Sequence, residues 1–292
     1  MNRAEQTSLV AIPLILLIAA AIGWAGSQGG ARAAGLPIFA WCAGLAFAIN
    51  WVAFVPAWLQ QSERYFDLTG SLSYLSLVAL SLGLHADPDP RALLLGGMVA
   101  GWAIRLGSFL FARIRRDGSD GRFDRIKPSL PRFLMAWTLQ GLWVLLTSSC
   151  ALAAMTSARS QPLGAPALLG GALWLAGFAF EVTADEQKRR FRADPANRGR
   201  FIRSGLWAWS RHPNYLGEIV LWIGIALVAL PALAGWQYAT LVSPLFVYVL
   251  LTRISGIPLL ESRANKRWGD DPEYRAHRAR TPLLFPRPPR SA

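Results

Sequence analysis

Long apolar runs, separated by short polar segments, organise this chain. Seven runs are close to bilayer-spanning length and an eighth is shorter; they lie at residues 9–26, 36–59, 92–112, 133–155, 163–180, 213–234 and 238–254, with the short run at 70–84. A helix needs about 20 apolar residues to cross the hydrocarbon core of a bilayer. None of the runs alternates apolar and polar residues as a transmembrane strand does. The pattern predicts an all-α fold, a polytopic membrane bundle of about seven or eight transmembrane helices.

Composition agrees with a membrane protein. Of the 292 residues 53% are apolar and 16% are charged, and the mean hydropathy is +0.31, which is more apolar than an ordinary soluble domain. We therefore expect one membrane domain over residues 1–292. The run at 9–26 is followed by small residues at 25–34, so a cleaved signal peptide is an alternative to a retained first helix.

The net charge of +13 comes mainly from basic residues in three segments, 113–132, 185–211 and 253–292. In a soluble protein such a charge would indicate nucleic-acid binding, but here the basic residues lie between spans, and we expect no nucleic-acid partner. With eight spans, all three segments fall on the same side as the amino terminus. The positive-inside rule makes that side cytoplasmic, and compact loops with alanine-rich helices favour a bacterial inner membrane.

Local sequence signals predict helices in two polar stretches. The helix of the sixth run is expected to continue through Glu181 to Arg192 and to end before Pro195, because proline disfavours a helical residue before it. Residues 261–274 predict one short basic helix at the membrane surface, followed by a proline-rich end.

A polar segment opens the apolar run after residue 213. Pro213 suits the first turn of a helix, where its missing N–H costs nothing. Arg211 and His212 directly precede that turn. Free N–H groups and the positive end of the helix dipole attract phosphate or carboxylate groups. The segment therefore predicts an anion site, although His212 also fits a packing role.

Asn214 and Glu218 are four residues apart and share one face of this helix. A carboxylate that enters a membrane span is energetically expensive and usually faces a polar cavity or the bundle interior. Glu218 is therefore a functional candidate. The alternative is a structural ion pair with a basic residue such as Arg211.

The segment Arg211-His-Pro-Asn-Tyr-Leu-Gly-Glu218 resembles the signature of the steroid 5α-reductase-like superfamily of membrane enzymes, and its core is also similar to isoprenylcysteine carboxyl methyltransferases. Three other segments favour the bacterial DUF1295 branch; they are Tyr65 to Tyr74, Trp102 to Leu106 with Arg113, and Ser255 to Glu261 before Arg267-Trp-Gly269. The resemblance covers residues 60–286 and is most specific at 181–286.

The resemblance implies a cytosol-facing NADPH pocket among the later helices and a lipid-like substrate that enters from the membrane. The cofactor-binding residues that it implies are Arg113, Asp185, Arg189, Arg192, Arg200, Arg211, His212, Asn214, Tyr215 and Glu218. Guanidinium groups suit phosphate because they form bidentate, charge-assisted hydrogen bonds. No glycine-rich Rossmann fingerprint is present, and the scattered histidines predict no metal site.

The implied reaction is hydride transfer from NADPH to the β-carbon of an α,β-unsaturated carbonyl, with a protein acid that polarises the carbonyl oxygen. We name Glu218 and Tyr74 as candidate catalytic groups. Trp102 occupies the position of a tyrosine that the 5α-reductases carry, and an indole is no general acid. Tyr74 also fits an interfacial aromatic belt.

Two other functions remain open. An S-adenosylmethionine-dependent methyltransferase of a lipid or lipidated thiol would share the signature core, but the arginines at 189, 192 and 200 favour a cofactor with more phosphate. A scaffold or transporter would bind no nucleotide, and its buried polar residues would line a path through the bundle.

Overall fold

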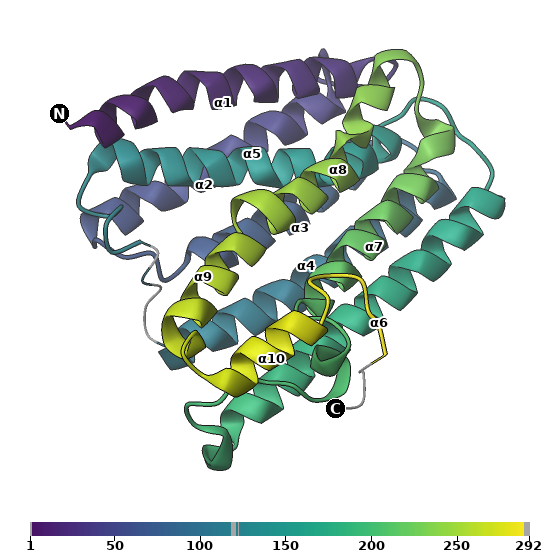
Figure 1. The fold of residues 1–292 in the computed structure, drawn as a ribbon. Coiled ribbons are helices and arrows are strands. Elements are labelled where there is room, and N and C mark those ends of the chain that lie inside the picture. Colours follow the sequence, from purple (N-terminus) through teal and green to yellow (C-terminus); the bar gives the residue numbers. More distant parts are fainter. Residues whose placement is uncertain (1, 118–120, 122, 289–292) are drawn as a thin grey trace. The chain divides into compact units, whose positions relative to one another are not determined.

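The computed structural model describes residues 2–117, 121 and 123–288, apart from the side chains of residues 113, 116 and 117. Within this part, eight helical segments are long and apolar enough to cross a membrane. The chain is thus an integral, multi-pass membrane protein (Figure 1). The all-α prediction is confirmed, and the short run at 70–84 is the core of a full-length helix, Phe66–Leu84.

The main helices are α1 (Arg3–Ser27), α2 (Ile38–Leu59), α3 (Phe66–Leu84), α4 (Pro90–Asp117), α5 (Leu130–Met155), α6 (Ala165–Ala193), α7 (Pro213–Ala229), α8 (Val242–Val249), α9 (Ile257–Trp268) and α10 (Pro272–Arg280). A small hairpin of β1 (Arg32–Ala33) and β2 (Leu36–Pro37) joins α1 to α2. The 3₁₀ segment η4 (Gly235–Leu241), α8, the π-helical segment η5 (Leu250–Ile254) and α9 together form the eighth candidate span.

The carboxy-terminal region contains two helices where the sequence predicted one over 261–274. Helix α9 ends at Trp268, and the Gly269 N–H donates to the Asn265 carbonyl at 2.8 Å. Helix α10 then begins at Pro272, with the Asp271 carboxylate accepting from the Glu273 N–H at 2.8 Å. A side-chain cap followed by proline in the first turn is a strong start signal, so the prediction of one continuous helix was wrong.

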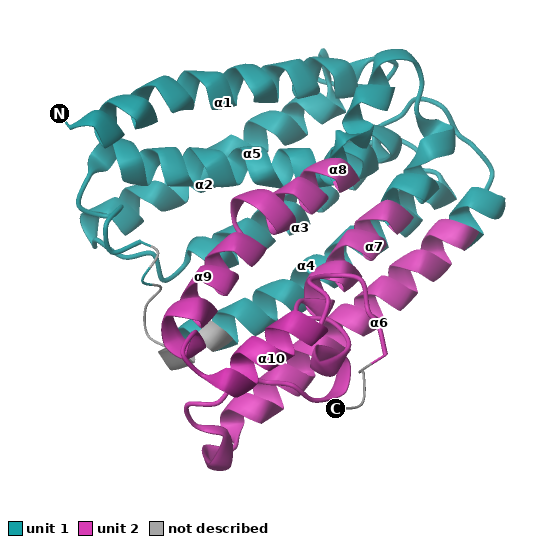
Figure 2. Ribbon diagram, in the orientation of Figure 1, with its two compact units in different colours: residues 1–168, 225–243 teal, residues 169–224, 244–292 magenta. Residues whose placement is uncertain are grey.

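The chain forms two compact units (Figure 2). Unit 1 comprises residues 1–168 and 225–243, and unit 2 comprises residues 169–224 and 244–292. Each unit combines segments that are distant in the sequence. The interpretation of residues 1–292 as one membrane domain stays a prediction.

In unit 1, helix α5 lies at the centre, and helices α1 to α4 all pack against it. Phe54, Phe133 and Trp137 form an aromatic cluster inside this bundle. Arg91, in the first turn of α4, is only 1% exposed and donates to the carbonyls of Val228 at 2.5 Å and Pro162 at 2.7 Å. Carbonyl acceptors are what a buried guanidinium needs when it has no carboxylate partner, so Arg91 fastens three segments of unit 1 together.

In unit 2, helices α6 and α7 approach until their backbones touch. A Cβ atom added to Gly217 would lie 2.6 Å from the Gly177 carbonyl oxygen, and one added to Gly224 would lie 2.5 Å from the Gly170 carbonyl oxygen. Small residues permit this close packing, which is a common way for membrane helices to associate. The contact holds the first turns of α7 against the part of α6 that directly precedes its polar residues.

Candidate functional site

The loop between α6 and α7 is anchored on the end of α6. Trp207 is buried and donates from Nε1 to the Ala184 carbonyl at 2.9 Å, and the Leu206 N–H donates to Gln187 Oε1 at 2.9 Å. Gly205 has φ of +58° and lies so close to Gln187 that a side chain would collide with it. Because the loop is fixed here, the next residues, Ser210 to His212, have a defined position.

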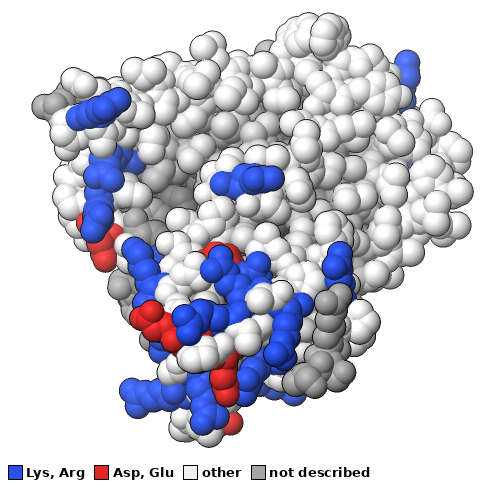
Figure 3. Space-filling view, viewed as in Figure 1, with Lys and Arg blue, Asp and Glu red and all other residues white. Residues whose placement is uncertain are grey.

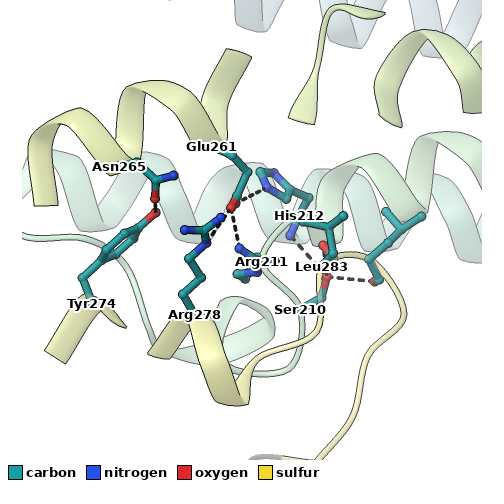
Figure 4. A network of polar contacts seen from close by, with 9 residues as sticks. Ser210, Arg211, His212, Glu261, Asn265, Tyr274, Arg278 and Leu283 are labelled. Carbon is teal, nitrogen blue, oxygen red and sulfur yellow. Dashed lines mark hydrogen bonds and ion pairs between the residues drawn. The ribbon is translucent and has the colours of Figure 1, made fainter. Parts of the chain in front are cut away.

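Glu261 of α9 is the centre of an ion-pair network (Figure 4). Its carboxylate forms an ion pair with Arg211, accepts from His212 Nε2 at 3.0 Å and lies 3.3 Å from Arg278 Nε. The three partners come from the loop before α7 and from α10, and the Glu261 side chain is 17% exposed. One carboxylate therefore joins three separate segments of unit 2.

The His212 ring is buried, and burial lowers the pKa of His212 below its ordinary value of 6.5, with the nearby Glu261 opposing part of that shift. His212 is thus neutral near pH 7. An ionised carboxylate only accepts hydrogen bonds, so Nε2 carries the ring proton and donates to Glu261. The ring also stacks on Tyr215, with planes 8° apart and centroids separated by 5.7 Å.

This network forms one wall of a cavity of about 320 Å³ in unit 2. The lining side chains come from α6, the 200–212 loop, α9 and α10; they are Lys188, Phe191, Arg192, Arg200, Phe201, Ile202, Trp207, Arg211, His212, Leu260, Glu261, Arg263, Ala264, Arg267, Trp268, Tyr274 and His277. The volume lies within the roughly 300–1,000 Å³ range of small-molecule sites.

The lining combines positive charge with aromatic rings. Lys188 and five arginines contribute cations, whereas Glu261 is the one acid among the described lining residues, and its carboxylate already binds Arg211, Arg278 and the neutral His212. Figure 3 shows Lys and Arg gathered over this part of unit 2. Guanidinium groups bind phosphate, and aromatic faces stack on planar rings. The arrangement suits a phosphorylated ligand that also has a planar group.

Four of the residues predicted to bind a cofactor line this cavity together: Arg192, Arg200, Arg211 and His212. Tyr215 contacts the cavity wall through its stack on His212. Asp185 is buried on α6. Asn214 and Glu218 lie in the first turns of α7 and are partly buried, and Asn214 Oδ1 makes no hydrogen bond to the described residues.

The other predicted residues lie elsewhere. Arg189 is not among the cavity-lining residues and forms a bidentate pair with Glu186, at 2.6 and 2.7 Å. The side chain of Arg113 lies outside the described residues. Tyr74 belongs to α3 in unit 1, where its ring meets Trp102 edge-on, with centroids 5.1 Å apart. The roles assigned to these residues stay predictions.

Sequence reasoning did not assign Glu261, Lys188, Tyr274 or Arg278 to the site. The position of Glu261 carried a signal, because it is an acid directly after the apolar stretch Ile257 to Leu260, where a charge needs a partner. Nothing in the sequence alone indicates that Arg278, 17 residues later, supplies part of that partnership. Only the turn between α9 and α10 brings the two residues together.

Residues 53–281 match the family described as "Protein of unknown function (DUF1295)". This match spans well over half of the chain. The chain belongs to the DUF1295 family. The recognition made from the signature segment is therefore confirmed, and all the residues that line the cavity of this DUF1295 protein lie within the matched range.

Curated relatives of this DUF1295 chain fall into several classes. An uncharacterized protein of Schizosaccharomyces pombe is 24% identical over 257 residues, which cover 78% of this chain and 72% of that protein. The 3-oxo-5-alpha-steroid 4-dehydrogenase 1 of Bos taurus is 35% identical over 72 residues, 25% of this chain and 28% of the relative. A probable O-methyltransferase of Ustilaginoidea virens is 28% identical over 147 residues, 45% of this chain and 50% of the relative.

The match to the yeast protein spans most of both chains, but the matches to the named enzymes span half or less of their length. These relatives connect the DUF1295 chain to reductase-like and methyltransferase-like membrane enzymes. No solved structure matches the chain.

Proposed function

We propose that this protein is a membrane reductase that uses NADPH to reduce a carbon–carbon double bond conjugated to a carbonyl group in a steroid or other lipid. The carrying observation is the cationic, aromatic-lined cavity that contains Arg211 and His212 of the signature segment. Two relatives, from Bos taurus and Rattus norvegicus, are named as 3-oxo-5-alpha-steroid 4-dehydrogenases. A lipid substrate also agrees with a chain built of apolar helices.

The donor set of the cavity fits a dinucleotide phosphate. Arg192, Arg200, Arg263 and Arg267 present guanidinium groups for the phosphates, and Phe201 and Trp268, whose rings meet at 6.0 Å, offer a surface for a base. Bound NADPH would supply the hydride that adds to the β-carbon of the enone. Lys188 adds a cation beside the Trp207 ring, at 4.1 Å from the ring centroid.

The protein's own residues would prepare this site. Glu261 holds Arg211 and His212 in one orientation, so these two side chains need little rearrangement when a phosphate binds. The reduced substrate finally requires a proton, and the Glu218 carboxyl and the Tyr74 hydroxyl are the groups that we propose for that step.

Methyl transfer from S-adenosylmethionine is the second candidate, and the Ustilaginoidea virens relative favours it. That cofactor carries a sulfonium and an ammonium group, and both require negative partners. In this cavity the Glu261 carboxylate is already shared by Arg211, His212 and Arg278. The charge balance of the site therefore favours a polyanionic cofactor over a cationic one.

A ligand panel separates the two candidates. A ligand that binds only the native state raises apparent stability, by about 2.7 kcal/mol at a hundred times its Kd. Detergent-purified protein is heated with NADPH, NADH or S-adenosylmethionine, and we expect NADPH to raise the Tm most. A rise with S-adenosylmethionine alone would replace reduction by methyl transfer, and no rise with any of the three would remove the enzymatic proposal.

A further inference from the structure

The last described residues cross the loop that carries the signature. Residues 282–288, here called the C-terminal strap, are held by three hydrogen bonds: Arg211 N–H to the Pro282 carbonyl at 2.9 Å, Ser210 Oγ to the Leu284 carbonyl at 2.8 Å, and Arg287 N–H to the Trp209 carbonyl at 3.0 Å. Ser210 and Leu284 are buried at this contact. The strap lies beyond residues 53–281, which match the family.

The outer face of the strap is apolar. Leu284 points inward, whereas its neighbours Leu283 and Phe285 are 39% and 69% exposed, and Trp209 beside them is 43% exposed. Pro213, which begins the seventh candidate span, is only four residues after Trp209. The patch must therefore lie near the level at which the bilayer starts, where aromatic side chains with one apolar face are stable.

A basic cleft of about 360 Å³ adjoins this patch. It is lined by Arg203, Ala208, Glu273, Ala276, His277, Arg280, Thr281, Arg287 and Pro288. Glu273 pairs with Arg203 at 2.8 Å, which leaves the cleft with an excess of guanidinium charge from Arg280 and Arg287. Burial and the nearby Arg211 and Arg203 lower the pKa of His277, so this ring adds no charge near pH 7.

We propose that the strap and this cleft form a binding site for an anionic phospholipid. The phosphate of the lipid meets Arg280 and Arg287, and its acyl chains cover Leu283, Phe285 and Trp209. A soluble anion would pair with the arginines but leave Phe285 in water, whereas a lipid satisfies both halves of the surface. The strap also holds Ser210 and Arg211 by hydrogen bonds, so lipid contact steadies the loop that lines the cavity. The lipid site does not require the proposed reaction.

The test places a fluorophore on the strap. The native thiols of Cys42 and Cys150 are buried, so a maleimide reagent labels Phe285→Cys alone. The labelled protein is reconstituted in nanodiscs of phosphatidylcholine, with or without phosphatidylglycerol, and quenched by lipids that carry a spin label. Asp270→Cys, on the exposed turn between α9 and α10, is the water-facing reference.

We expect strong lipid quenching at position 285, little at position 270, and an increase at 285 when phosphatidylglycerol is present. The double variant Arg280→Gln/Arg287→Gln should abolish that increase. Each arginine lost should lower the preference for phosphatidylglycerol over phosphatidylcholine by about fivefold. The matched control is Arg198→Gln/Arg275→Gln, which removes the same charge from exposed positions outside the cleft and should leave the increase intact.

Three results would overturn the proposal. Quenching at 285 no greater than at 270 would remove the strap from the bilayer, and blue-shifted emission without lipid quenching would identify a protein surface as its partner. Equal quenching with and without phosphatidylglycerol would leave an apolar anchor but no anionic-lipid site. Each readout is independent of nucleotide binding, so failure here is distinguishable from failure of the reductase proposal.

Discussion

Glu261 shows how one residue can organise a site. Three positive or hydrogen-bonding partners, Arg211, His212 and Arg278, converge on its carboxylate. Glu186 offers a contrast on the same unit, because it binds Arg189 and Arg190 within a single helix and at a more exposed position. An exposed pair within one helix contributes little to stability, whereas a half-buried pair that joins separate segments contributes more.

Glu261→Gln should therefore lower the free energy of unfolding by roughly 2 kcal/mol, because its three partners lose the negative charge of the carboxylate and one of its two acceptor oxygens. Glu186→Gln is the matched control, for which we expect a clearly smaller effect because its ion pairs lie within one helix and are exposed to solvent. Thermal unfolding of the purified variants measures both. Equal effects of the two substitutions would contradict the central role of Glu261.

A substitution of the single residue Arg200 tests ligand binding in the cavity. Arg200 lines the cavity, whereas Arg190 is an exposed arginine of α6 outside the lining. Loss of a charge-assisted hydrogen bond to phosphate costs about 1.5–3 kcal/mol, so Arg200→Ala should weaken NADPH binding by about tenfold or more. Arg190→Ala should leave the affinity unchanged. Titration of the intrinsic tryptophan fluorescence provides the measurement, and identical affinities would exclude Arg200 from the site.

At the scale of elements, the contact between α6 and α7 decides where the signature helix begins. Gly217 directly precedes Glu218, and its backbone touches α6 at Gly177 and Glu181. The sequence predicted the helices themselves from their apolar runs. It did not predict this crossing, because a glycine inside an apolar run does not indicate which other helix will pack against it.

Gly217→Ala should destabilise unit 2 by about 1–3 kcal/mol, since the added methyl group would meet main-chain atoms that cannot move aside. Gly171→Ala is a matched control on α6, because a Cβ atom there meets open space. That control should be neutral or slightly stabilising, as alanine is the better helix former. The Tm values of the two variants test the difference, and a neutral Gly217→Ala would argue against the close crossing.

The whole molecule is marked by its uneven charge. Basic segments follow the even-numbered spans, and the opposite loops carry few charges. The positive-inside rule then sets the orientation. We therefore expect the cavity and the strap to face the cytoplasm.

Labelling of introduced thiols in intact cells tests this orientation. Ser160, in the exposed loop after α5, should be labelled as cysteine by a membrane-impermeant maleimide, and Asp270→Cys should react only after the cells are permeabilised. The buried native cysteines remain silent. The reverse labelling pattern would invert the topology and place the cavity outside the cell.

The sequence alone determined the features that depend on local composition. Examples are the length of each span, the polar extension of α6 and the family signature at 211–218, which are all properties of contiguous residues. In a bilayer, an apolar run of spanning length forms a helix, because the backbone must satisfy its own hydrogen bonds there. The turn between α9 and α10 was missed, although the capping signal of Asp271 and Pro272 was present in the chain.

Tertiary structure decided which distant residues share a site. The contact of Arg211 with Glu261 joins residues 50 positions apart, and the contact of Ser210 with the strap joins residues 74 apart. The pair of Glu261 and Arg278 joins α9 to α10 across 17 positions. Such contacts depend on where helices cross and chains turn back, which in turn depends on packing at glycines such as Gly217. From the sequence, the basic residues of a loop indicate which side of the membrane the loop lies on. Whether those residues line a ligand cavity depends on the neighbouring segments that the fold brings beside them.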